Sequence, residues 1–84
     1  MTYFWPGGIP IKVQVDPSGR PLSIVWNGKS HRVDLISVGR LVDDRWWVAR
    51  VWRAYYRVIT ASGLLLVIFR NLITNTWYLE RLYD

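Results

Sequence analysis

The residue types that catalyse reactions or bind metal ions are scarce in this sequence. His31 is the only imidazole, and a general base of this kind needs a neighbouring partner. Because side chains alternate between the two faces of a strand, Asp34 would lie on the opposite face from His31. The adjacent carboxylates Asp43 and Asp44 could hold a divalent cation, but no other residue nearby has metal-ligand spacing. The sequence therefore predicts no enzymatic activity, no metal site and no bound cofactor.

Chemistry of another kind is concentrated in residues 40–57, where arginines are interleaved with aromatic residues. This stretch holds five arginines, five aromatic residues and two aspartates, and so it carries +3 of the net charge of +5. Guanidinium groups bind phosphates through paired hydrogen bonds and stack on rings. Interleaved aromatic side chains are typical of proteins that bind single-stranded nucleic acid. The candidate partner-binding or nucleic-acid-binding residues are Arg45, Trp46, Trp47, Arg50, Arg53, Tyr55 and Arg57.

Two other interpretations use the same residues. In a domain without disulfides, tryptophan is first of all core material, and arginine often covers it by cation–π stacking. Trp, Tyr and Arg are also enriched at protein–protein interfaces, either with another protein or between copies of one chain. Residues 40–57 therefore predict a solvated basic face, a protein interface or a nucleic-acid face.

Size and composition limit the kind of domain that can carry these residues. The chain has 84 residues with no Cys and one His, so disulfides and the usual zinc sites are excluded. So short a domain needs a dense apolar core or a partner, and 51% of the residues are hydrophobic. The net charge of +5 indicates anionic partners. The longest apolar run, Leu64–Phe69, is too short to cross a bilayer, and the N-terminus lacks a signal-peptide pattern, so we expect a cytoplasmic protein.

Alternation and turn residues predict six strands. β-Branched and aromatic residues dominate, and turn signals recur at short intervals, as in an antiparallel β-meander. Asn27-Gly28 is the strongest turn signal, because both residues tolerate a positive φ. Gly39 predicts a bulge or bend inside the third strand. The expected strands are residues 9–15, 22–26, 30–42, 52–61, 64–70 and 76–83.

These elements predict an all-β fold with a single small β domain over residues 9–84, preceded by an extended lead-in over residues 1–8. The short connections favour a small antiparallel barrel or a strongly curved meander sheet of SH3-like type. Closure of the sheet would also remove exposed strand edges, which a chain this apolar needs.

Residues 45–58 are ambiguous, because both the helical and the strand period fit their pattern. The β-branched sequence Val58-Ile59-Thr60 favours a strand from about residue 52. We expect a loop or a short helical turn over residues 44–50 before that strand.

Several motifs resemble a bacterial C-terminal module. The chain contains Asp43-Asp44-Arg45-Trp46-Trp47, then Arg53-Ala54-Tyr55-Tyr56-Arg57-Val58-Ile59-Thr60, and ends in Trp77-Tyr78-Leu79-Glu80-Arg81-Leu82-Tyr83-Asp84. This order is similar to the module that follows the polymerase-like part of ImuB-type proteins, catalytically inactive Y-family relatives in the translesion mutasome. Small stand-alone proteins of the DUF6504-like group have a similar layout, with a hairpin ahead of it that here reads Pro21-Leu22-Ser23-Ile24-Val25-Trp26-Asn27-Gly28.

The resemblance covers about residues 9–84 and implies a non-catalytic accessory module in DNA repair or replication. Its partners would be proteins of a repair complex or DNA. The chain departs from the family pattern where Asp44 replaces Glu before Arg45, and it carries no polymerase-like region. We therefore expect an interaction module that contacts protein or DNA. A direct single-stranded nucleic-acid binder and a homo-oligomer, such as a homodimer, are the alternatives.

Overall fold

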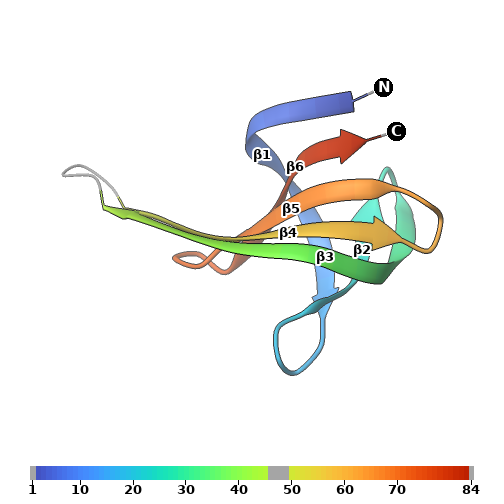
Figure 1. Ribbon diagram of the computed structural model, residues 1–84, viewed down its shortest axis with the longest axis horizontal. Helices are drawn as coiled ribbons and strands as arrows, with labels where there is room; N and C mark the ends of the chain where they lie inside the picture. Colours follow the sequence, from blue (N-terminus) through green and yellow to red (C-terminus); the bar gives the residue numbers. More distant parts are fainter. Residues whose placement is uncertain (1, 46–49, 84) are drawn as a thin grey trace.

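Six antiparallel strands make up the part of the chain that the structure describes, residues 2–45 and 50–83 of a computed structural model. Each strand pairs with the next along the chain, and β1 also pairs with β6, so the sheet closes into a barrel (Figure 1). The strands are β1 (Thr2–Val15), β2 (Pro21–Trp26), β3 (Lys29–Arg45), β4 (Arg50–Thr60), β5 (Leu65–Asn71) and β6 (Thr76–Tyr83). The predicted all-β antiparallel fold is confirmed. Within the described residues, no helix is long and apolar enough to cross a membrane.

Turns form where the sequence places residues suited to them. Asn27 and Gly28 have φ angles of 54° and 76° and connect β2 to β3 in two residues, as predicted. In the turn between β1 and β2, Oδ1 of Asp16 accepts hydrogen bonds from the hydroxyl of Ser18 at 2.7 Å and from the backbone N–H groups of Ser18 and Arg20 at 2.9 Å. These hydrogen bonds, that of the Ser18 hydroxyl first, lower the pKa of Asp16.

The first strand is longer than the sequence pattern predicts, because its N-terminal part also belongs to the sheet. Residues 2–4 pair with the end of β6, and pairing resumes at Ile9 after a register shift. The bend falls at Gly8, where φ is 79° and an added Cβ would lie 2.7 Å from Cβ of Tyr78. Residues 2–8 of the expected extended lead-in are therefore the first part of β1. Its glycines form a bulge between two paired segments of one strand rather than a linker.

Inward-facing side chains from all six strands fill the barrel. Because strand side chains alternate, Leu66 and Ile68 on β5 both point inward and have no exposed surface. Thr60 is also buried, and its hydroxyl accepts a hydrogen bond from the backbone N–H of Leu64 at 3.0 Å, which satisfies the polar group. The buried core cluster consists of Ile24, Val58, Leu66, Ile68, Trp77, Leu79 and Leu82, with Trp5, Ile9, Ile11 and Val13 of β1 packed against it.

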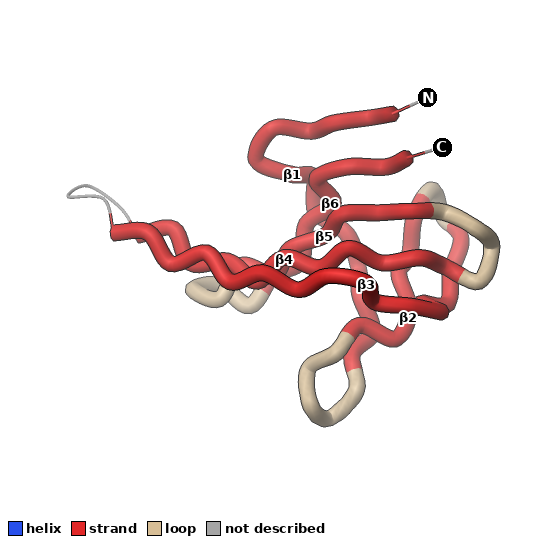
Figure 2. The backbone as a smooth tube through the Cα atoms, viewed as in Figure 1, coloured by secondary structure: helices blue, strands red, loops and turns tan. Residues whose placement is uncertain are grey.

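Strands β3 and β4 extend beyond the barrel as a two-stranded arm, seen on the left of Figures 1 and 2. They pair from Val33 opposite Thr60 to Arg45 opposite Arg50, whereas β4 pairs with β5 only as far as Arg53. The bulge expected near Gly39 is present just before it, as register shifts between Val33 and Leu35 and between Ile36 and Val38.

The expected turn over residues 44–50 is wrong at both of its ends. Asp44 and Arg45 belong to β3 and Arg50 belongs to β4, while residues 46–49 lie outside the described part of the chain. The helical alternative is likewise excluded for residues 50–58. Pairing with β3 gives the β4 backbone its hydrogen-bond partners, and this tertiary pairing decides between two periods that the sequence supports equally.

Candidate binding face

One row of side chains crosses four neighbouring strands on the outside of the barrel. Arg40 on β3 is opposite Tyr55 on β4, Tyr55 is opposite Phe69 on β5, and Phe69 is opposite Tyr78 on β6. The guanidinium of Arg40 lies 4.9 Å from the ring centroid of Tyr55. The centroids of Tyr55 and Phe69 are 5.1 Å apart, as are those of Phe69 and Tyr78. The row is therefore a continuous aromatic strip with a cation at its β3 end.

Arg53 holds this aromatic strip in place. Its guanidinium lies 4.6 Å from the ring centroid of Phe69, and its Nη1 donates a hydrogen bond to the Tyr55 hydroxyl at 3.1 Å. Phe69 has no exposed surface although it lies on the outer face, because Arg53, Tyr55, Tyr78 and the bend at Gly8 cover it. Arg53 therefore contributes to the packing of the outer face, and its guanidinium already contacts two side chains of the protein.

A second row runs parallel to the first. Arg57 on β4 is opposite Val67 on β5, Val67 is opposite Arg81 on β6, and Arg81 is opposite Phe4 on β1. Arg57 and Arg81 are exposed, and the guanidinium of Arg81 lies 4.6 Å from the ring centroid of the exposed Phe4. This row thus presents two arginines to solvent on either side of an aliphatic residue.

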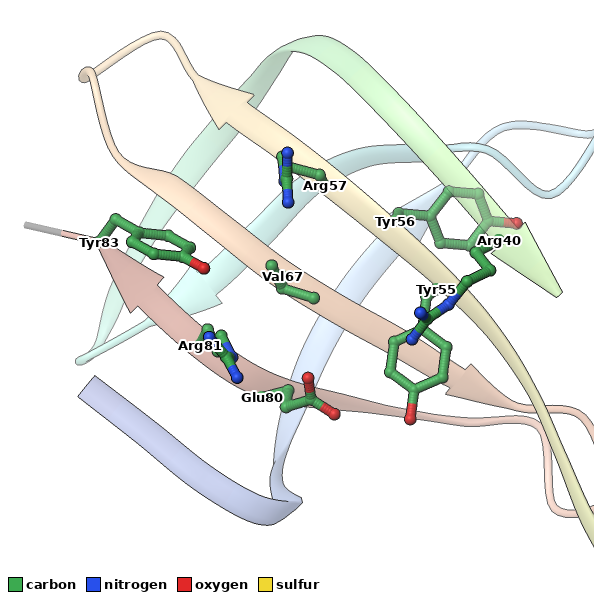
Figure 3. A pocket seen from close by; sticks show the side chains of 8 residues that line it. All are labelled: Arg40, Tyr55, Tyr56, Arg57, Val67, Glu80, Arg81 and Tyr83. Carbon is green, nitrogen blue, oxygen red and sulfur yellow. The ribbon is translucent and has the colours of Figure 1, made fainter. Parts of the chain in front are cut away.

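A hollow of about 270 Å³ lies over these rows (Figure 3). Val67 is between Arg57 and Arg81, with Tyr83 toward one end of the hollow and Tyr55 toward the other. The described residues that line it carry three arginines and one glutamate, a net charge of +2. They are Arg40, Tyr55, Tyr56, Arg57, Val67, Glu80, Arg81 and Tyr83.

The residues proposed from sequence divide into two groups within the part of the chain that the structure describes. Arg53, Tyr55 and Arg57 alternate along β4 and share its outer face, as the strand period predicts. Arg45 and Arg50 pair with each other at the far end of the arm, and Arg50 is seven residues, roughly 23 Å, from Arg57. Trp46 and Trp47 lie outside the described residues. The five candidates within the described residues therefore do not form one compact site.

Other residues of the hollow were missed in the sequence analysis. Arg81, Glu80 and Tyr83 come from β6, and Val67 comes from β5. A signal for them exists, because an antiparallel meander places β4, β5 and β6 side by side, so outward residues of the three strands meet. The register between β5 and β6 cannot be predicted from the local sequence, because a register shift falls between Val67 and Ile68.

The isolated imidazole has a hydroxyl partner. Nδ1 of His31 lies 2.9 Å from Oγ of Ser62, which in turn lies 2.8 Å from Oγ1 of Thr60. These contacts tie the start of β3 to the turn between β4 and β5, away from the hollow. Within residues 2–45 and 50–83, no three His, Cys, Asp or Glu side chains are grouped so that they could hold a metal ion.

Comparison of the chain with protein-family models, with curated proteins and with solved structures finds no significant match. The hollow and its two rows of side chains are therefore the features that indicate a function.

Proposed function

We propose that this domain is a non-catalytic binding module that holds single-stranded nucleic acid on the outer face of β4, β5 and β6. A setting in DNA repair or replication is suggested by the resemblance to ImuB-type C-terminal modules. The observation that carries the proposal is the placement of Arg57 and Arg81 on either side of Val67, with tyrosines at both ends of the hollow.

This arrangement matches the chemistry of a single strand. Exposed guanidinium groups bind phosphate oxygens through paired, charge-assisted hydrogen bonds. The half-buried ring of Tyr83 offers a face on which an unpaired base can stack, and at the other end of the hollow the Arg40 guanidinium over the Tyr55 ring offers a second stacking surface. A duplex hides its base faces within its own stack, so the tyrosines favour single strands. A protein interface would use the same residue types, but the net charge of +2 in the hollow favours a polyanion.

The salt dependence of binding to a short fluorescent oligothymidylate tests the proposal. Each phosphate contact to a single strand contributes about −0.7 to the slope of log affinity against log salt. We expect Arg57→Ala and Arg81→Ala to reduce the magnitude of that slope, by about this amount in total if the two guanidinium groups share one phosphate and by about this amount each if they bind two. Arg32→Ala is the matched control, because Arg32 is an exposed arginine of β3 outside the hollow.

Anisotropy titrations between about 50 and 200 mM salt give the slopes. The proposal fails if the wild-type protein does not bind the oligonucleotide or binds it independently of salt. Equal slopes for Arg57→Ala, Arg81→Ala and the control would contradict the proposed location. The corresponding duplex should bind more weakly than the single strand.

A further inference from the structure

Strand β3 has an unprotected edge on the arm. It pairs with β2 only through residues 29–32 and with β4 through residues 33–45. In the described part of the chain, no strand pairs with the other edge of β3 between Val38 and Val42. Leu41 lies on this segment and is 66% exposed. This edge offers backbone donors and acceptors to another extended strand.

Two of the usual protective devices, bulges and lysine, lie elsewhere on β3, and the charged side chains within residues 38–45 are of both signs. Natural sheets protect an edge with proline, lysine or bulges that turn the strand away from a partner. The two bulges of β3 precede Val38, and the ladder with β4 is regular from Val38 to Arg45. No proline or lysine occurs in residues 38–45. The regular part of the edge is therefore suited to strand addition.

We infer that the partner of this edge is β3 of a second copy of the chain, paired antiparallel about a two-fold axis at Val42. This inference is independent of the proposed function. The charge order along the segment is self-complementary, because Arg40 and Asp44 lie two residues on either side of Val42. When Val42 is opposite Val42 of the second copy, Arg40 is opposite its Asp44, and the same pair recurs across the axis.

The same register also brings the exposed leucines together. Leu41 is then diagonally across the new ladder from Leu41 of the second copy, on the opposite face from Arg40, within reach of long side chains. A two-fold axis perpendicular to the sheet keeps the Arg40 faces of both copies on one side. Because the arm extends away from the barrel (Figure 2), the two barrels lie at opposite ends of the shared ladder. So short a ladder predicts a weak dimer.

The test is the molar mass of the protein without nucleic acid, measured by light scattering between about 10 µM and 1 mM. The wild-type mass should rise with concentration from 9.9 kDa toward twice that value and level off there. Arg40→Glu places like charges opposite each other in the homodimer, and so does Asp44→Arg. Each variant alone should stay monomeric. An equimolar mixture should dimerise again, because both charge pairs are then complementary.

The mixture separates loss of pairing from loss of folding, since two misfolded variants would not restore a dimer. The matched control is Arg32→Glu, the same charge change on β3 outside the pairing segment, which should dimerise like the wild type. A wild-type protein that stays monomeric overturns the inference. Dimerisation of Arg40→Glu alone, failure of the mixture to dimerise, or a mass that grows beyond two copies would also overturn it. Because nucleic acid is absent, either outcome is independent of the binding proposal.

Discussion

Arg57 on β4 and Arg81 on β6 stand in the same cross-strand row, and Val67 of β5 is the residue paired with both. Two strand spacings separate their backbones by roughly 10 Å. Two extended guanidinium side chains can converge on one anion across this distance, above an aliphatic floor. Their action on a ligand is therefore expected to be coupled.

A double-mutant cycle on these two arginines tests the coupling. If both guanidinium groups hold one phosphate, removing the second arginine costs less once the first is absent. We expect the binding free energies of Arg57→Ala, Arg81→Ala and the double variant to be non-additive, with an interaction energy of about 0.5–3 kcal/mol. The measurement is oligothymidylate affinity at a fixed low salt concentration. Additive losses would indicate that the two arginines contact separate phosphates.

Glu80 is expected to weaken the binding of anions to the hollow. It is half-buried and is the one acidic side chain among the described residues that line the hollow. Glu80→Gln removes that charge with little change in shape, and should tighten oligothymidylate binding by about 0.2–1 kcal/mol at low salt. The matched control is Asp34→Asn, which removes one negative charge from an exposed site on β3 outside the hollow. A gain of the same size in the control would mean that only net charge matters.

Gly8 is expected to be a sensitive position for stability. Its φ of 79° is unfavourable for any side chain, and an added Cβ would lie 2.7 Å from Cβ of Tyr78 and 2.8 Å from Cε1 of Phe69. Gly7 has a similar φ of 77° but no atom within 4 Å of an added Cβ. Gly7→Ala should therefore cost about 1–2 kcal/mol from the backbone alone. Gly8→Ala should cost a further 1–3 kcal/mol, roughly, from overpacking.

Urea unfolding of both variants separates the two contributions. Equal losses of unfolding free energy would mean that Phe69 and Tyr78 move aside without cost. Because Phe69 supports the aromatic strip, Gly8→Ala should also weaken oligothymidylate binding more than Gly7→Ala does.

Asp16 should give the folded protein a component of stability that acid removes. Its pKa is lower in the folded chain than its ordinary value of 3.8, because its carboxylate accepts hydrogen bonds from Ser18 and Arg20. This contribution is complete above the pKa of the unfolded chain and is lost as pH falls through the lower folded pKa. Asp16→Asn lacks the titrating group and cannot lose this contribution. The unfolding free energy of the variant should therefore rise relative to that of the wild type below about pH 4.

Urea midpoints of wild type and Asp16→Asn at neutral pH and at about pH 3 provide the measurement. The control Asp34→Asn removes an exposed carboxylate of β3, outside the turn that holds Asp16. A stability difference between wild type and Asp16→Asn that stays constant across this pH range would contradict the prediction.

The sequence predicts the fold well because strand formation here is signalled locally. Asn27 and Gly28 adopt the positive φ angles that their residue types favour, and the continuous apolar run Leu64–Phe69 coincides with β5, in which Leu66 and Ile68 are buried. The pattern is incomplete before Ile9, because the expected lead-in of residues 1–8 continues into β1 through the bulge at Gly8. It is also insufficient in β4, where pairing with β3 decides between helix and strand.

The site was less predictable than the fold, since it is assembled across strands. Arg53, Tyr55 and Arg57 follow from the two-residue period of a single strand. Arg81 joins them only through the register of β5 with both neighbours, which the shift next to Val67 alters. Arg45 and Arg50 were grouped with them by closeness in sequence, but an extended chain carries them away along the arm.

The pairing of Thr2 with Tyr83 has a consequence for how the protein is made. The barrel closes through its first and last strands, so the most distant parts of the chain must meet before the structure is complete. Such long-range contacts slow folding, because the intervening chain must be ordered first. On the ribosome, the nascent chain would hold an open sheet with β1 and β5 unpaired along one side until β6 emerges. Pairing of the eight-residue strand β6 with both β1 and β5 is therefore the step that completes the fold.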